Sequence, residues 1–143
     1  RRTCNGVDFN RLILVSAVLS RRAGLTLANQ DIIVNVTGGL RISEPAADLG
    51  IALAIASNIY DTPLDPRCVY LGEIDLTGEV RPVPQLERRL AEAINLGFKT
   101  ALVPDGGDKA RIVSADIKTI PVATIREAIH HVFPKHRSAS SNS

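Results

Sequence analysis

The chain has 143 residues, the length of one globular domain with a substantial core. Hydrophobic residues make up 45% of the sequence, and the formal net charge is only +2, which excludes an extensively disordered chain. Such a small net charge does not by itself indicate nucleic-acid binding, although thirteen of the seventeen basic residues are Arg, which suits phosphate. Aromatic residues amount to 3%, so base stacking cannot dominate any contact with nucleic acid.

Membrane insertion, secretion and metal binding are not indicated. No uncharged apolar run reaches membrane-spanning length, and the basic N-terminus lacks the apolar run of a signal peptide. The chain starts with Arg1 and has no initiator Met, so we expect it to begin inside a longer protein. Cys4 and Cys68 are too few for a disulfide framework or a zinc site, and Cys68 is expected to be a small buried thiol. His130 and His131 are adjacent, a poor arrangement for one metal ion.

The first predicted elements are a helix and a strand. Asp8 has the residue type of an N-cap for a helix from Phe9 to about Ala23. Residues 31–36 are apolar and rich in β-branched side chains, which is typical of a strand. Three arginines lie off the apolar stripe of the helix, where a solvated face is favoured over a contact surface: Arg11, Arg21 and Arg22.

A loop and a long apolar helix follow. Gly38-Gly39 permits backbone conformations that a side chain would forbid, without the spacing of a phosphate-binding loop. The run 47–60 is apolar almost all round and too long for a strand, so it is predicted to be a buried helix. Pro45 suits its first turn, and Asp48 lies near the positive end of its dipole. Ser43 or Glu44 is expected to cap it.

The second half of the chain continues the alternation. Residues 67–75 are predicted to be one strand, followed by a turn at Thr77-Gly78 and a short strand at 79–83 that pairs back. Further predicted elements are a helix over 84–96 ended by Gly97, a strand at 99–104, a short helix at 109–113 and a strand at 116–121.

The last predicted element has a capping box. Thr124 and Glu127 have the required spacing, and the helix that they open runs to Phe133 before Pro134 stops it. Residues 1–134 are therefore taken as one domain, and residues 135–143 as a polar, disordered tail. Because helices and strands alternate, the fold class is α/β, or α+β with a mixed sheet.

One segment resembles the active site of Lon-type proteases. There a strand leads to a loop Asp-Gly-Pro-Ser-Ala-Gly, whose Ser attacks the peptide. The matching residues here are Ser43-Glu44-Pro45-Ala46-Ala47-Asp48. Pro45 and Ala47 match, and the resemblance places Ala46 at the position of the nucleophile.

A second segment agrees with the same family without gaps. Residues 72–89 begin Gly72-Glu-Ile-Asp-Leu-Thr-Gly-Glu-Val-Arg81, similar to the Lon segment Gly-Glu-Ile-x-Leu-x-Gly-x-Val. The catalytic lysine of that family falls on Glu87, so both members of the Ser–Lys dyad are missing. Together the segments resemble the C-terminal Lon-like domain of the bacterial RadA (Sms) DNA-repair family, over about residues 6–133. The resemblance implies a Lon protease-like fold, related to the second domain of ribosomal protein S5.

The resemblance also implies a function and partners. In that family a RecA-like ATPase moves on DNA, and the Lon-like domain supports assembly of a hexameric ring and binding of single- and double-stranded DNA. A RecA-type recombinase is an expected partner of the parent protein. ATP, Mg and a zinc finger are expected only in preceding domains, and no cofactor is expected in this chain. The expected location is the bacterial cytoplasm, or a chloroplast or mitochondrion if the source is a plant.

Four arginines near the two segments are the DNA-binding candidates: Arg41, Arg81, Arg88 and Arg89. The alternative is a scatter of solvated charges paired with neighbouring Glu residues. Two further functions remain open: a peptide- or protein-binding module that kept a Lon groove, and a peptidase with displaced catalytic residues. For the peptidase, Ser43 is the nearest hydroxyl, and Lys99 and Lys109 are the lysines nearest to Glu87 in sequence.

Overall fold

The computed structural model describes residues 2–5, 9–25, 32–35, 44–106 and 116–136. Helices and strands alternate along the chain, so the predicted α/β class is confirmed. The elements are β1 (Arg2–Asn5), α1 (Phe9–Arg22), β2 (Ile32–Asn35), the 3-10 turn η2 (Pro45–Ala47), α2 (Asp48–Tyr60), β3 (Cys68–Tyr70), β4 (Glu73–Ile74), β5 (Val80–Arg81), α3 (Leu86–Asn95), β6 (Thr100–Pro104), β7 (Lys118–Val122) and α4 (Ile125–Val132).

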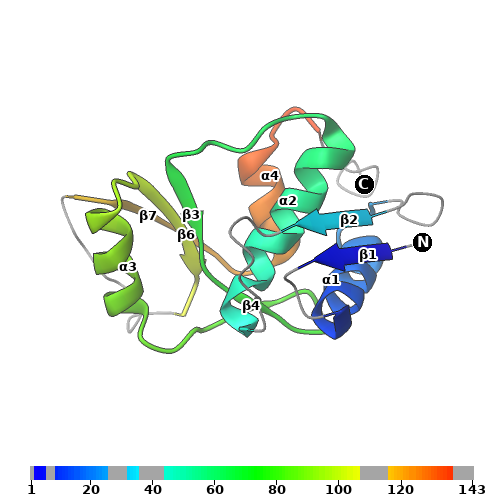
Figure 1. Cartoon of the computed structure of the whole chain (residues 1–143), viewed down its shortest axis with the longest axis horizontal. Helices are drawn as coiled ribbons and strands as arrows, with labels where there is room; N and C mark the ends of the chain where they lie inside the picture. Colours follow the sequence, from blue (N-terminus) through cyan, green and yellow to red (C-terminus); the bar gives the residue numbers. More distant parts are fainter. Residues whose placement is uncertain (1, 6–8, 26–31, 36–43, 107–115, 137–143) are drawn as a thin grey trace.

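Parallel and antiparallel pairing are both present, in separate sheets. The strands β3, β6 and β7 form one parallel sheet, in which Leu102 pairs with Tyr70 on one side and Ile120 on the other. A second parallel pair joins β1 to β2, and β4 and β5 form an antiparallel hairpin around the predicted turn at Thr77-Gly78. The three-stranded sheet with α3 lies at one end of the molecule, and the β1–β2 pair with α1 lies toward the other (Figure 1).

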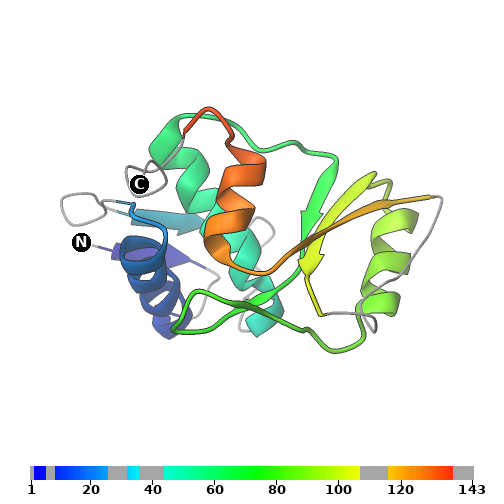
Figure 2. The same ribbon diagram turned by 180° about the vertical axis from the view of Figure 1, so that it is seen from behind.

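The core is built around α2. This helix runs through the middle of the molecule beside α1 and α4 (Figure 1, Figure 2). Leu49, Ala52, Leu53 and Ala56 are fully buried, which confirms the prediction of a buried helix from its apolar surface. A smaller apolar cluster packs α3 against the sheet through Leu90, Ala93, Ala101, Val103 and Ile117. The segment between β3 and α3 passes the start of α2, where Leu49 N donates to Gly72 O.

The predicted strand over 67–75 is wrong, because the chain leaves the parallel sheet after Tyr70. Leu71 N still donates to Leu102 O at 3.0 Å, but Gly72 N donates to Ala46 O at 3.0 Å instead of to a strand. Leu49 N in turn donates to Gly72 O at 3.0 Å. A Cβ at Gly72 would lie 2.6 Å from Val80 Cγ1, so only glycine fits this close approach.

The helix ends follow some of the predicted signals. Thr124 caps α4 by accepting a hydrogen bond from Glu127 N at 3.0 Å, which confirms the predicted cap, while Glu127 Oε1 accepts from the N–H of the preceding residue, Ala123, at 2.8 Å. Gly97 ends α3 with a φ of +93°, as expected of a C-terminal glycine. Glu44 stands at the N-cap of η2 with no capping hydrogen bond from its side chain. The predicted cap Asp8, the Gly38-Gly39 loop, the short helix at 109–113 and the tail from 137 lie outside the described residues.

A buried carboxylate joins three elements at the start of α2. The side chain of Asp48 is fully buried and accepts from Arg11 Nε at 2.6 Å and from Ile74 N at 3.0 Å. The second terminal nitrogen of Arg11 also pairs with Asp48 Oδ2. Arg11 was predicted to lie on a solvated face of α1, and this is wrong, because only 20% of its side chain is exposed.

We predict that Asp48→Ala lowers the free energy of unfolding by about 3 kcal/mol, because it removes one member of a largely buried ion pair and orphans Ile74 N. Urea denaturation followed by circular dichroism measures the change. The control is Arg21→Ala, an exposed arginine of α1, the helix that carries Arg11, and it should change the stability by less than about 0.5 kcal/mol. A loss below about 1 kcal/mol for Asp48→Ala would mean that the pair contributes little beyond its own desolvation.

Candidate functional site

The two Lon-like segments meet in space at the start of α2. Residues 44–48 form η2 and the first residue of α2, and residues 72–89 form the β4–β5 hairpin and the first part of α3. The backbone of Gly72 is held between Ala46 O and Leu49 N, and Asp48 accepts from Ile74 N. The two sequence segments that carry the family resemblance therefore lie against each other and are joined by hydrogen bonds.

The two dyad positions hold no nucleophile and no amine. Ala46 lies in η2 and is 5% exposed, so its methyl group is packed into the protein. Glu87 is in the first turn of α3 and is exposed. A carboxylate there has no hydroxyl at position 46 to activate. Of the residues considered for a displaced dyad, Lys99 is exposed between α3 and β6, whereas Ser43 and Lys109 lie outside the described residues.

An ion pair links the segments next to the dyad positions. A terminal nitrogen of Arg89 on α3 pairs with Glu44 Oε1, immediately before η2. Arg89 Nε donates to Pro84 O at 2.8 Å, so the guanidinium is held at two points. The side chain of Arg89 is 27% exposed and that of Glu44 is 52% exposed. This pair was not predicted, since its residues are far apart in sequence and neither carries a local signal.

The four DNA-binding candidates differ in their surroundings. Arg88 is exposed on α3, and no hydrogen bond or ion pair joins it to another residue in the described part of the chain. Arg81 on β5 is 55% exposed and lies 3.5 Å from Glu79, which is itself 57% exposed. Arg89 is paired with Glu44, and Arg41 lies outside the described residues. Among the described candidates, Arg88 is therefore the one whose positive charge is not paired with a described carboxylate.

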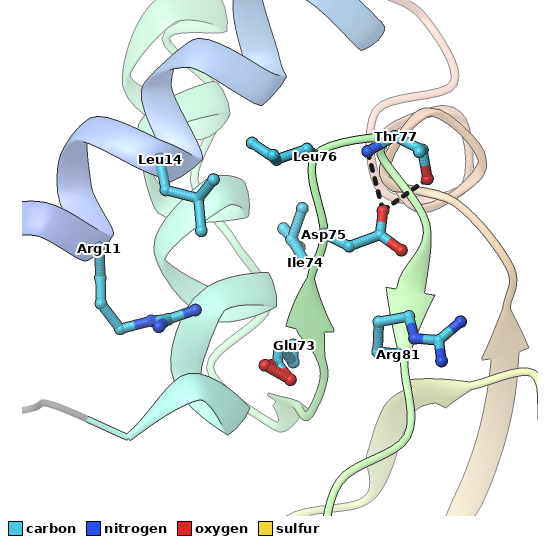
Figure 3. Close-up of a pocket in the computed structure, with 8 residues that line it drawn as sticks. All are labelled: Arg11, Leu14, Glu73, Ile74, Asp75, Leu76, Thr77 and Arg81. Atoms are coloured by element: carbon cyan, nitrogen blue, oxygen red, sulfur yellow. Dashed lines mark hydrogen bonds between the residues drawn. The ribbon is translucent and has the colours of Figure 1, made fainter.

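A groove of about 520 Å³ separates α1 from the β4–β5 hairpin. Leu14 and Ile74 line it, and Figure 3 shows the Leu76 side chain reaching from the hairpin turn toward α1. Leu76 is 72% exposed, and with Ile13 and Leu96 it is one of three large exposed hydrophobic residues in the described part of the chain. The charged residues at this groove balance in sign: Arg11, Arg81, Glu73 and Asp75. The groove is therefore apolar with a mixed rim, and it lacks the positive excess of a phosphate-binding channel.

The hairpin turn that carries Leu76 is held by Asp75. Its Oδ1 accepts from Thr77 Oγ1 at 2.6 Å and from Thr77 N at 2.9 Å (Figure 3). It also accepts from Glu79 N at 3.0 Å. The hydrogen bond from the Thr77 hydroxyl, together with these backbone donors, lowers the pKa of the Asp75 carboxyl below its ordinary value. The carboxylate thus remains ionised near neutral pH, and the turn keeps Leu76 at the groove.

A second cavity, of about 300 Å³, contains a cysteine and a histidine. Cys68, Tyr70 and His131 line it, between the three-stranded sheet and the end of α4. Burial raises the pKa of the Cys68 thiol above its ordinary value, and burial likewise raises the pKa of the Tyr70 hydroxyl. Cys68 Sγ approaches Val69 O at 3.6 Å, and no hydrogen bond in the described part of the chain joins it to His131. The expected buried thiol is half-buried, and it lacks the features of an activated nucleophile.

No group of three or more His, Cys, Asp or Glu side chains in the described part of the chain could hold a metal ion. No helix within the described ranges is long and apolar enough to cross a membrane.

Three proteins named DNA repair protein RadA are similar to most of the chain. That of Synechocystis sp. is 46% identical over 140 residues, which cover 98% of this chain and 27% of the relative. That of Halalkalibacterium halodurans is 46% identical over 129 residues, covering 90% and 28%. That of Streptococcus pneumoniae is 44% identical over 133 residues, covering 93% and 32%. The chain thus spans about three tenths of the length of these relatives.

A family profile gives a second match. The profile described as "Subunit ChlI of Mg-chelatase" matches residues 6–107, which contain α1, α2, α3 and the two Lon-like segments. Since this match covers most of the chain, the chain belongs to the family described as subunit ChlI of Mg-chelatase, and its curated relatives named above are DNA repair proteins RadA.

Proposed function

We propose that this chain is a non-catalytic Lon-like domain of a RadA-type DNA repair and recombination protein. The observation that carries the proposal is 44–46% identity to proteins named DNA repair protein RadA over 90–98% of the chain. Identity at that level is a more specific guide than a family description. In the parent protein the domain supports assembly of a hexameric ring and binds DNA without sequence preference. The ATPase with its Mg, a zinc finger and the contact with a RecA-type recombinase belong to other domains.

The Lon-like part of the proposal rests on the two segments and their geometry. Residues 44–48 and 72–89 match the family motifs and lie against each other at the start of α2. Ala46 and Glu87 occupy the dyad positions that the resemblance assigns. A buried methyl group cannot attack a carbonyl, so the domain keeps the scaffold without the peptidase chemistry.

We predict that the chain hydrolyses neither casein nor a fluorogenic peptide, and that Ala46→Ser does not restore cleavage. The single change supplies a hydroxyl, but Glu87 leaves it without a general base, and a nucleophile and its base act as a unit. Peptide turnover followed by fluorescence measures both variants. Ala46→Ser combined with Glu87→Lys is the positive comparison, for which only a trace of turnover is expected. Robust cleavage by wild type that Ser43→Ala abolishes would establish a displaced peptidase instead.

We also predict that Cys68 is a slow nucleophile. Since burial raises the pKa of its thiol, the thiolate fraction at pH 7.5 is smaller than that of glutathione, and the rate rises only as the pH approaches the raised pKa. The measurement is the reaction rate with a disulfide reagent in a Cys4→Ser background, with glutathione as control. A rate above that of glutathione, lost in His131→Ala, would identify a Cys–His pair in the cavity.

DNA binding by this domain should rest on phosphate neutralisation. Aromatic residues are only 3% of the chain, so stacking contributes little. Arg88 and Arg81 are exposed, whereas the charges around the groove balance. A single domain with so few contacts should bind in the non-specific range, with Kd about 10⁻⁴–10⁻⁶ M at physiological salt. A ring increases the avidity by raising the effective concentration of the remaining domains after the first contact.

We predict that Arg88→Ala weakens binding to all DNA sequences alike and flattens the dependence of log K on log salt by about 0.9, the value for one lost phosphate contact. Fluorescence anisotropy with labelled single- and double-stranded DNA across a salt series measures both effects. Arg67→Ala is the control for net charge, because Arg67 is exposed, is paired with Asp65 and lies before β3, outside residues 44–48 and 72–89. Equal losses in both variants would mean that only net charge matters.

A second candidate function is the binding of an extended apolar peptide in the groove beside α1. The observation that favours it is the exposed Leu76 beside Leu14 in a groove of balanced charge. If an unfolded peptide binds the chain, and Leu76→Ser abolishes this binding while DNA binding is absent in wild type, the peptide function is the correct one. Leu96→Ser is the control, because Leu96 is 68% exposed but lies at the end of α3.

A further inference from the structure

Two neighbouring arginines on α3 have opposite environments. Arg88 is exposed, and no described residue forms a hydrogen bond or ion pair with it. Arg89 uses Nε on Pro84 O at 2.8 Å and a terminal nitrogen on Glu44, and only 27% of its side chain is exposed. A guanidinium with two fixed partners is already ordered in the free domain, so holding it in this position costs little additional conformational entropy. The helix thus presents one arginine outward and holds the next against its own domain.

The partner of Arg89 lies at a sensitive point of the backbone. Glu44 has extended backbone angles, φ −80° and ψ 127°, and its side chain does not cap the turn that follows. Pro45 fixes the next φ, and η2 leads directly into α2. The carboxylate of Glu44 therefore pairs with Arg89 instead of capping η2, and this ion pair holds the residue directly before η2.

Charge argues against a direct role of Arg89 in phosphate binding. Its positive charge is already matched by Glu44, which is 52% exposed. Moving Arg89 to a phosphate would break this pair and leave the Glu44 carboxylate close to another anion. Arg88 carries no such penalty, because no described carboxylate is paired with it.

We propose that Arg89 is a positioning residue that straps α3 to the entry of η2 through Glu44, while Arg88 makes the phosphate contact; the second half of this assignment rests on the proposed DNA-binding function. The strap joins the two segments that carry the dyad positions, since Glu44 precedes Ala46 by two residues and Arg89 follows Glu87 by two. A Glu–Arg ion pair thus connects the elements that carry Ala46 and Glu87.

The test is a double-mutant cycle in the 143-residue chain with Glu44→Gln, Arg89→Gln and both changes, read by DNA anisotropy over a salt series. A strap predicts that both single variants weaken DNA binding by about two- to fivefold, that the double variant is no weaker than either, and that the salt slope stays at the wild-type value. The charge-swapped pair Glu44→Arg with Arg89→Glu should recover most of the affinity. Arg88→Gln should instead flatten the slope by about 0.9.

If Arg89 itself contacts phosphate, the same variants should change the DNA affinity and the salt slope differently. Glu44→Gln would then tighten DNA binding, because it releases Arg89 and removes a negative charge, and Arg89→Gln would flatten the salt slope as Arg88→Gln does. Either result overturns the proposal. Thermal unfolding of the same four proteins tests the strap without DNA: the shifts of the two single variants in Tm should be non-additive, and additive shifts also overturn it. If wild type binds no DNA, the DNA-binding function fails, and the strap is decided by the unfolding cycle alone.

Discussion

The buried carboxylate of Asp48 is the constraint on which the arrangement of this domain depends. It is fully buried and holds Arg11 of α1 and the backbone N–H of Ile74 in β4, so two elements are fixed relative to the first turn of α2. Burying a charge is expensive unless it is paired and hydrogen-bonded, and Asp48 meets both conditions. Its position in the first turn of α2 also suits the positive end of the helix dipole. Its partners indicate a larger role, because alternative packings of α1 or of the hairpin would leave the charge without them.

The same region is held together by backbone contacts and by two ion pairs. Gly72 passes within hydrogen-bonding distance of Ala46 and Leu49, and no larger residue fits there because of Val80. Asp48 secures the hairpin on one side, and Glu44 with Arg89 secures α3 on the other. All of these contacts hold backbone segments in place, and none requires a reactive group at position 46 or 87.

Local signals in the sequence predict local structure, and the errors occur where distant residues decide. The length and apolar surface of 47–60 predict a buried helix, and Thr124 with Glu127 predicts the start of α4, because each signal acts within a few residues. The single strand predicted for 67–75 is wrong because alternation of side chains does not reveal that Gly72 turns to Ala46. Arg11 was misassigned for the same reason, since its partner lies 37 residues away. Of the candidate site, Ala46 and Glu87 came from motif matching, whereas the Arg89–Glu44 pair, 45 residues apart, was beyond any local pattern.

The charge distribution favours a domain that adds to DNA binding within an assembly over one that binds DNA alone. The net charge is only +2, and three of the described arginines near the two segments, Arg11, Arg81 and Arg89, have acidic partners, so long-range attraction of DNA is weak. Among the described residues of these segments, this leaves the exposed Arg88, which lies on the helix that the proposed strap would hold in place. One such contact per domain has little effect in a monomer. In the proposed ring, however, six fixed copies act on one DNA molecule, and roughly millimolar effective concentrations would convert weak single contacts into useful avidity. A rigid domain suits such a ring, because the Arg88 side chains of the six copies can contact one DNA strand at the same time only if each helix α3 keeps its orientation.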